Sequence, residues 1–169
     1  MGSWVMAATL RRSIRHALII GFIAISTALG QGCGSRPATE VYVPGLGEMM
    51  SAQQMRHVKL WFAGQAENWE LADYEIDELG EGFDDIVKFH PTHKDSPVAP
   101  KDAIPRMVTQ PLKDLRGAIE KKDARAFVQA YDSLTAACNN CHQATNFAFN
   151  TVQTPTTNPY PNQVFTRGK

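Results

Sequence analysis

Several features are scarce or absent in this chain of 169 residues. It has three cysteines, and its 17 basic residues balance its 17 acidic ones. No basic stripe is visible, which argues against a nucleic-acid-binding protein. The longest apolar run, residues 17–29, is too short for a permanent membrane span. No strand pattern, internal repeat or low-complexity segment interrupts the remainder, so we expect one all-helical domain.

Residues 1–32 are predicted to be an export signal. Three arginines (Arg11, Arg12 and Arg15) and no acidic residue precede or adjoin the apolar run, and small residues follow it. The residues after Arg12 fit a twin-arginine signal poorly, so general secretion to the periplasm or the outer face of a bacterial membrane is expected. Without this segment 14 basic residues face 17 acidic ones, a net charge of −3.

Cys33 stands at the end of the signal. The residues before it, Leu29-Gly30-Gln31-Gly32, resemble a degenerate lipoprotein cleavage box, which would attach a lipid to Cys33. The alternative is ordinary cleavage after Gly30, which would leave Cys33 in a mature tail. Residues 33–45 are then a short linker with proline and glycine.

The other two cysteines form the pattern Cys138-Asn139-Asn140-Cys141-His142. C-x-x-C-H is the attachment signal of a c-type haem. Thiols about one helical turn apart suit thioether bonds to the two vinyl groups of one porphyrin, and the following histidine supplies an axial nitrogen to the iron. A redox C-x-x-C would favour a βαβ context and not need His142. A zinc site would need a further ligand pair, which is not visible. We therefore predict one haem c.

Apolar residues recur at helical spacing from Leu46 onward. We expect a first helix from 46 to about 66–68 and a second from 69 to 89. A crossover at 90–102, punctuated by prolines, precedes a third helix with Pro105 in its first turn. Pro111 should either kink that helix or mark its true start after Thr109. Asp123 is the expected N-cap of a fourth helix that carries the haem motif.

These elements predict an all-α antiparallel four-helix bundle over residues 46–146, with the covalent haem on the last helix. Residues 147–169 form an extended, proline-rich tail that either packs over the bundle or stays mobile.

A haem signal close to the C-terminus, on the last of four helices, resembles the class II cytochromes c, which comprise cytochrome c-prime and its low-spin relatives. The resemblance covers residues 47–146 and implies that Cys138 and Cys141 carry the thioethers and His142 is the proximal ligand. It also hints at a homodimer through the first two helices. Thr145 and Asn146 depart from the aromatic and basic residues usual there, and the chain continues further than usual. A divergent member of the group is expected.

Three possibilities exist for the sixth coordination position of the iron: two different protein ligands, or none. In an antiparallel bundle the haem end of the last helix lies beside the first half of the first helix. His57, at the centre of that helix's apolar face, is the first candidate ligand, and Met50 on the same face is the second. The resemblance to class II cytochromes also permits a blunt apolar cover, with Leu60 blocking an empty iron position. Arg56 either balances a haem propionate or is a solvated surface residue.

We expect an electron carrier rather than an enzyme, because no acid/base pair for catalysis is evident beside the iron. The alternative is a haem protein that binds or senses a small gas, nitric oxide or carbon monoxide, at an open iron. The second helix carries eight acidic residues without a basic one until its last turn, which is either a docking surface for a basic redox partner or a solvated face.

Overall fold

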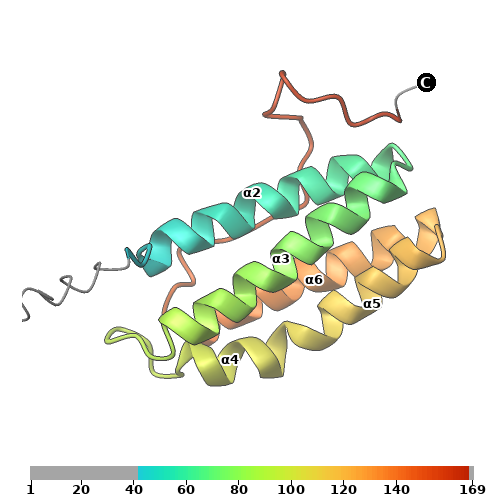
Figure 1. Ribbon diagram of the computed structural model, residues 1–169. Coiled ribbons are helices and arrows are strands. Elements are labelled where there is room, and N and C mark those ends of the chain that lie inside the picture. Colours follow the sequence, from blue (N-terminus) through green and yellow to red (C-terminus); the bar gives the residue numbers. More distant parts are fainter. Residues whose placement is uncertain (1–41, 168–169) are drawn as a thin grey trace, which may run out of the picture. The chain divides into compact units, whose positions relative to one another are not determined.

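The computed structural model describes residues 42–167, and helices are the only secondary-structure elements in this part of the chain (Figure 1). The predicted export signal and Cys33 lie outside it. The helices are α2 Leu46–Gln65, α3 Trp69–Phe89, α4 Pro100–Met107, α5 Thr109–Glu120 and α6 Ala124–Ala144. Within residues 42–167, no helix is long and apolar enough to cross a membrane.

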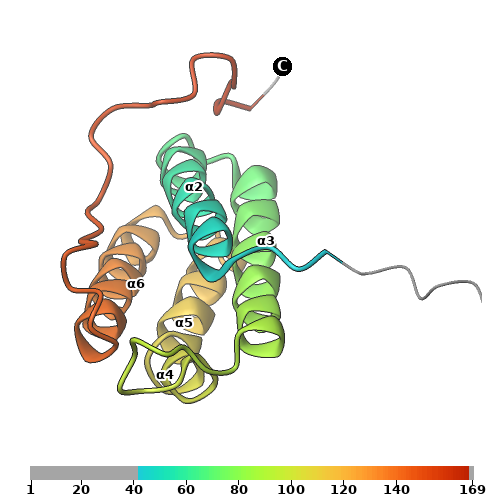
Figure 2. The same ribbon diagram turned by 90° about the vertical axis from the view of Figure 1, so that its left-hand side faces the viewer.

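The helices lie side by side along their lengths (Figures 1 and 2). α2 and α3 are joined by a short turn and pack together most extensively. α4 and α5 follow one another, and both contact α3 and α6. α6 packs chiefly on α5 and touches α2 only sparsely. The gap between α2 and α6 is therefore the least closed side of the helical core.

Helix ends agree well with the sequence. α3 has the expected bounds, and α2 ends one residue before the expected range. The Asp123 side chain caps α6 by accepting hydrogen bonds from the backbone N–H groups of Arg125 and Ala126, at 3.1 and 3.0 Å. Capping of this kind satisfies N–H groups that have no partner inside the helix.

The third helix differs from the prediction because it is divided. α4 begins at Pro100, inside the expected crossover, and Pro105 lies in its interior rather than in its first turn. The division falls at Val108. Pro111 explains it: a proline has no N–H to donate and its ring clashes with the carbonyl four residues earlier, which here is Met107, the last residue of α4. Pro111 thus occupies the first turn of α5, where no N–H is needed.

The core follows the expected apolar positions. In α3 the residues at alternating four- and three-residue steps are all buried: Ala72, Ile76, Leu79, Phe83 and Ile86. Aromatic rings from α2 and α6 meet beside them, with 4.8 Å between the ring centroids of Trp61 and Tyr131. Gly64 makes room for this cluster, because a Cβ there would overlap the ring of Phe127.

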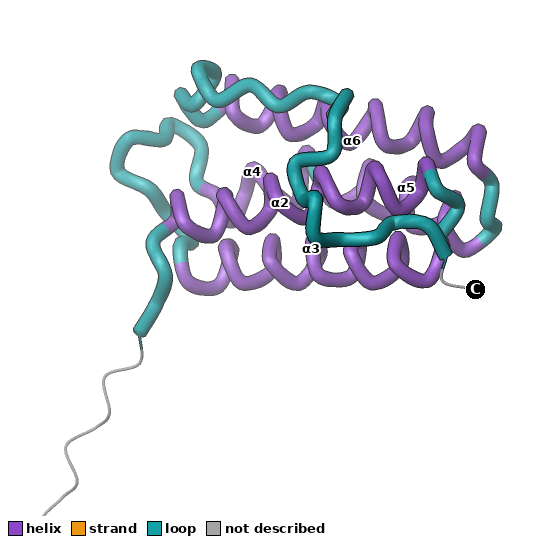
Figure 3. Tube along the Cα trace, turned by 90° about the horizontal axis from the view of Figure 1, so that it is seen from above, coloured by secondary structure: helices purple, strands orange, loops and turns teal. Residues whose placement is uncertain are grey.

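Residues 147–167 form a strap that returns along α6 and then crosses α2 (Figure 3). Asn139 holds its first part through two hydrogen bonds to the backbone of Val152, both 2.8 Å. Its far end is fixed by Phe165, whose ring is buried beside Phe62 at 5.6 Å between centroids. Of the two alternatives for the tail, packing over the bundle or remaining mobile, the structure shows packing.

We expect Gly64→Ala to destabilise the fold by about 1–3 kcal/mol, because the added methyl group overpacks the contact with Phe127. Gly117→Ala is the matched control: nothing lies within 4 Å of a Cβ at that helical position, so it should stabilise by about 0.5–1 kcal/mol. Urea unfolding of both variants measures the free energies. Equal effects of the two substitutions would contradict the close approach at Gly64.

Candidate functional site

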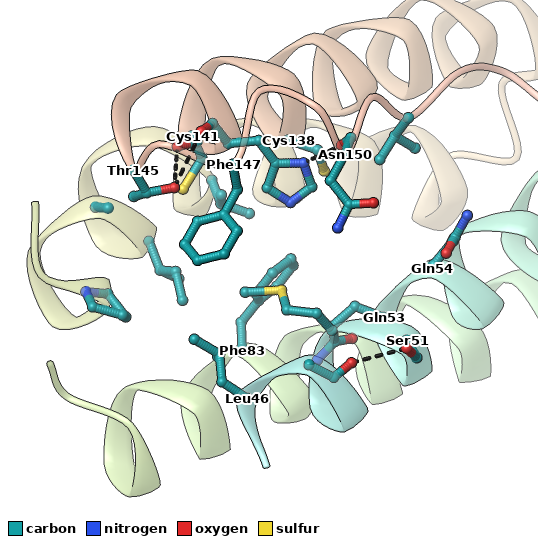
Figure 4. A pocket seen from close by; sticks show the side chains of 18 of the residues that line it. Leu46, Ser51, Gln53, Gln54, Phe83, Cys138, Cys141, Thr145, Phe147 and Asn150 are labelled. Atoms are coloured by element: carbon teal, nitrogen blue, oxygen red, sulfur yellow. Dashed lines mark hydrogen bonds between the residues drawn. The ribbon is translucent and has the colours of Figure 1, made fainter. Parts of the chain in front are cut away.

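A cavity of about 420 Å³ lies where α2 begins and α6 ends. Pockets that hold cofactors or other small molecules span about 300–1,000 Å³. α6 and the strap supply one wall, and α2 and α3 face it (Figure 4). α4 and the segment before it close the remaining side. Most of the lining is apolar, and no lysine, arginine, aspartate or glutamate is part of it.

Both cysteines of the motif line this cavity as free thiols. Burial raises the pKa of Cys138 to about 12. Burial also raises the pKa of Cys141, against a smaller opposing effect of the Arg106 charge. Reactive redox cysteines have lowered pKa values, because the thiolate is the nucleophile. The two neutral, raised-pKa thiols are thus unlike a dithiol–disulfide exchange pair.

His142 is held in one orientation by the strap. Its Nδ1 donates a hydrogen bond to the backbone carbonyl of Asn150, with 2.6 Å between the nitrogen and the oxygen. This bond assigns the proton to Nδ1 and leaves Nε2 as the nitrogen with a free lone pair. A backbone carbonyl behind a histidine is the usual support of a metal-binding imidazole.

The end of α6 explains how Asn150 reaches His142. Asn146 has a positive φ of 68°, and the N–H of Phe147 bonds the carbonyl of His142 at 2.7 Å. A left-handed residue just past a helix is a common terminator, and asparagine adopts it readily. The turn directs the chain back along α6. The residues that depart from the class II pattern, Thr145 and Asn146, are therefore the ones that end the helix.

His57 lines the cavity but its ring nitrogens are both engaged. Nε2 lies 2.9 Å from the hydroxyl of Thr135, and Nδ1 lies 2.9 Å from the hydroxyl of Tyr131. Since the Thr135 hydroxyl donates to the Tyr131 carbonyl at 3.0 Å, it accepts from His57 Nε2–H. Burial lowers the pKa of His57 to about 4, so the ring is neutral at pH 7.

Of the other residues predicted to lie beside the haem, one lines the cavity and two do not. Met50 lines the cavity and is half-buried. Arg56 does not line it; its guanidinium pairs with the Glu78 carboxylate on α3. Leu60, the candidate cover, is fully buried and also lies outside the lining.

Gln53 is a lining residue that sequence reasoning missed. Its side chain is only 6% exposed, and its Oε1 is buried without a hydrogen-bond partner. Gly82 of α3 accommodates it, because a Cβ at Gly82 would overlap the Gln53 carboxamide. The sequence does carry a signal of this contact, namely a glycine that weakens the interior of α3.

The strap residues were missed as well. Phe147 and Asn150 line the cavity, and the Phe147 ring meets the His93 ring edge-on at 5.4 Å between centroids. The phenylalanines just past the motif were the only sequence signal that this segment is anchored.

The arrangement can hold a flat apolar group through two sulfurs and one imidazole nitrogen. Within residues 42–167, no group of three or more His, Cys, Asp or Glu side chains is placed to hold a metal ion. Comparisons of the chain with protein-family models, with curated proteins and with solved structures found no match.

The lowered pKa of His57 makes stability depend on pH. The unfolded state, with a histidine pKa near 6.5, binds more protons than the folded state between pH 6.5 and 4. The stabilisation is therefore present above pH 6.5 and is lost as the pH falls towards 4, by about 3 kcal/mol. Urea unfolding at several pH values should show this loss, and His57→Gln, which does not titrate, should lose less. Parallel pH profiles would contradict the neutral buried ring.

Proposed function

We propose that this chain is an exported mono-haem c-type cytochrome that transfers electrons through one covalently bound haem. The observation that carries the proposal is the convergence of Cys138, Cys141 and His142 on one apolar cavity, with His142 Nδ1 bonded to a backbone carbonyl and Nε2 left free. When bound, the haem supplies a one-electron couple at its iron. In this proposal the helices form an antiparallel four-helix bundle, with the cofactor on the last helix.

The chain's own residues fit such a group in three ways. The two thiols lie in the cavity in neutral form, which suits addition to vinyl groups. The apolar lining excludes water from most of the macrocycle. His142 keeps the lone pair of its Nε2 free for an iron ion, because its Nδ1 is bonded to the Asn150 carbonyl.

The mouth of the cavity indicates where electrons would enter and leave. The exposed lining residues are Gly47, Ser51 and Gln54 on α2, and Asn150 and Thr151 on the strap. We propose that the haem edge and its propionates lie there, among neutral polar groups and water. Arg56 would have to leave Glu78 to reach a propionate.

We propose Met50 rather than His57 as the axial ligand opposite His142. A His57 nitrogen could bind iron only by giving up its bond to Tyr131 or Thr135, which would leave a buried hydroxyl with one partner fewer. Met50 lines the same wall, and a methionine has no hydrogen bond to lose. A methionine ligand raises the reduction potential of a haem.

The acidic residues of α3 support a proposed basic redox partner. Fewer of their carboxylates are free than the sequence suggested. Asp77 and Glu78 are paired with Arg116 and Arg56, and Glu75 is buried. The carboxylates that remain exposed and without an ion pair lie on the outer side of α3: Asp73, Glu81, Asp84 and Asp85. A surface of this kind speeds encounter with a positively charged protein at low salt.

A small-gas-binding protein is the second candidate, favoured because both His57 ring nitrogens are already bonded, which leaves one candidate fewer for the sixth iron position. An enzyme is less well supported, because His57, a lining residue that could act as an acid or base, is bonded through both ring nitrogens to Thr135 and Tyr131. A catalytic acid or base needs to reach the reacting group.

We expect the chain, matured in a host that attaches c-type haem, to carry the mass of one haem per polypeptide. Cys138→Ser and Cys141→Ser should each leave at most one thioether, and the double variant should release its haem on acid extraction. His142→Ala should retain the covalent mass while its absorption spectrum changes. Mass spectrometry and absorption spectra measure this, and a wild-type chain without added mass would overturn the proposal.

We expect Met50→Leu to abolish the near-infrared charge-transfer band of methionine-ligated ferric haem and to lower the reduction potential. Met49→Leu is the matched control, because Met49 packs on the core outside the cavity lining. His57→Gln should keep the band. A wild-type protein without this band, whose spectrum changes in His57→Gln but not in Met50→Leu, would assign the ligand to His57 instead.

A further inference from the structure

Asn139 is a polar residue inside the haem motif whose side chain the proposed function does not use. Its carboxamide donates from Nδ2 to the Val152 carbonyl and accepts at Oδ1 from the Val152 N–H, each at 2.8 Å between the heavy atoms. The side chain thus takes up both backbone groups of one strap residue, as a neighbouring β-strand would. Both bonds are partly buried and of ordinary length, so they fix the strap firmly at Val152.

The residue that Asn139 holds lies next to the acceptor of His142. Only one residue separates Val152 from Asn150, whose carbonyl accepts from His142 Nδ1–H. On its other side Asn150 is held by a turn, because its N–H donates to the Phe147 carbonyl at 2.9 Å. The Asn150 carbonyl is therefore fixed from both directions along the chain, by the turn before it and by Asn139 after it.

The spacing along α6 explains why one segment of the strap meets both side chains. Asn139 and His142 are three residues apart, so they lie on the same side of the helix. Asn140, the other variable residue of the motif, lies about 100° further round the helix than Asn139, and it is exposed. Of the two variable positions, the first is therefore the one that faces the strap.

We propose that Asn139 is a positioning residue that lowers the reduction potential of the haem by keeping the Asn150 carbonyl on His142. A carbonyl that accepts from Nδ1–H makes the other ring nitrogen, Nε2, a more basic ligand. A more basic ligand stabilises ferric iron relative to ferrous iron. Asn139 does not line the cavity and acts only through the strap, and the inference rests on the proposed haem.

The test measures the reduction potential of the holoprotein. Asn139→Ala should release Asn150 from His142 and weaken the preference of the imidazole for ferric iron by about tenfold, which raises the potential of a one-electron couple by about 59 mV. Val152→Pro removes the N–H at the other end of the pair and leaves the motif as it is, so it should shift the potential in the same direction. In both variants the His142 Nδ1 proton should exchange with D₂O about two- to ten-fold faster, the loss of one hydrogen bond, as followed by NMR of the reduced holoprotein.

Two control variants separate this role from a general loosening of the strap. Asn140→Ala makes the same change at the exposed position of the motif and should alter neither the potential nor the exchange rate. Thr154→Val removes the 3.1 Å hydrogen bond between the strap and Asp132, further along the chain, and should also alter neither. If haem is attached but Asn139→Ala and Val152→Pro leave both quantities unchanged, or Thr154→Val shifts them equally, the role of Asn139 is wrong while the cytochrome proposal stands. A chain without haem would overturn both.

Discussion

The termination of α6 two residues after His142 is the constraint on which the site depends. Asn146 takes a left-handed conformation, the chain reverses, and the strap brings the Asn150 carbonyl to His142 Nδ1. If α6 continued, no backbone acceptor would stand behind the imidazole and one wall of the cavity would be missing. The turn that ends α6 thus also fixes the tautomer of His142 and forms one wall of the cavity.

A second constraint lies in the packing between α2 and α6. Because α6 packs on α5 and meets α2 only sparsely, the space between them holds side chains that need room or polar partners. The His57–Tyr131–Thr135 network occupies its middle and is fully bonded. The cavity occupies its end, and there the fold leaves Gln53 without a partner. The bonded network stabilises the middle of this space, whereas the cavity at its end is lined mainly by apolar side chains.

Much of the fold could be predicted, because helical periodicity and capping are local signals. The bounds of α3, the cap at Asp123 and the apolar seam of α3 needed only spacing and residue type. The early start of α4 did not follow, since several prolines in one segment offered more than one possible first turn. In the site, the motif predicted which side chains share the cavity, but hydrogen-bond partners such as Asn150 and Thr135 depend on tertiary contacts that periodicity does not encode. Arg56 shows the same limit, because its partner Glu78 lies on another helix.

The strap gives the cavity a wall that is independent of the helices. Residues 147–152 follow the motif in the chain, and hydrogen bonds to Asn139 and His142 fasten them to α6. Lifting this segment breaks a few such bonds and unwinds no helix turn. Parting this segment from α6 would therefore expose the side of the cavity on which both sulfurs lie, with the helical core left intact.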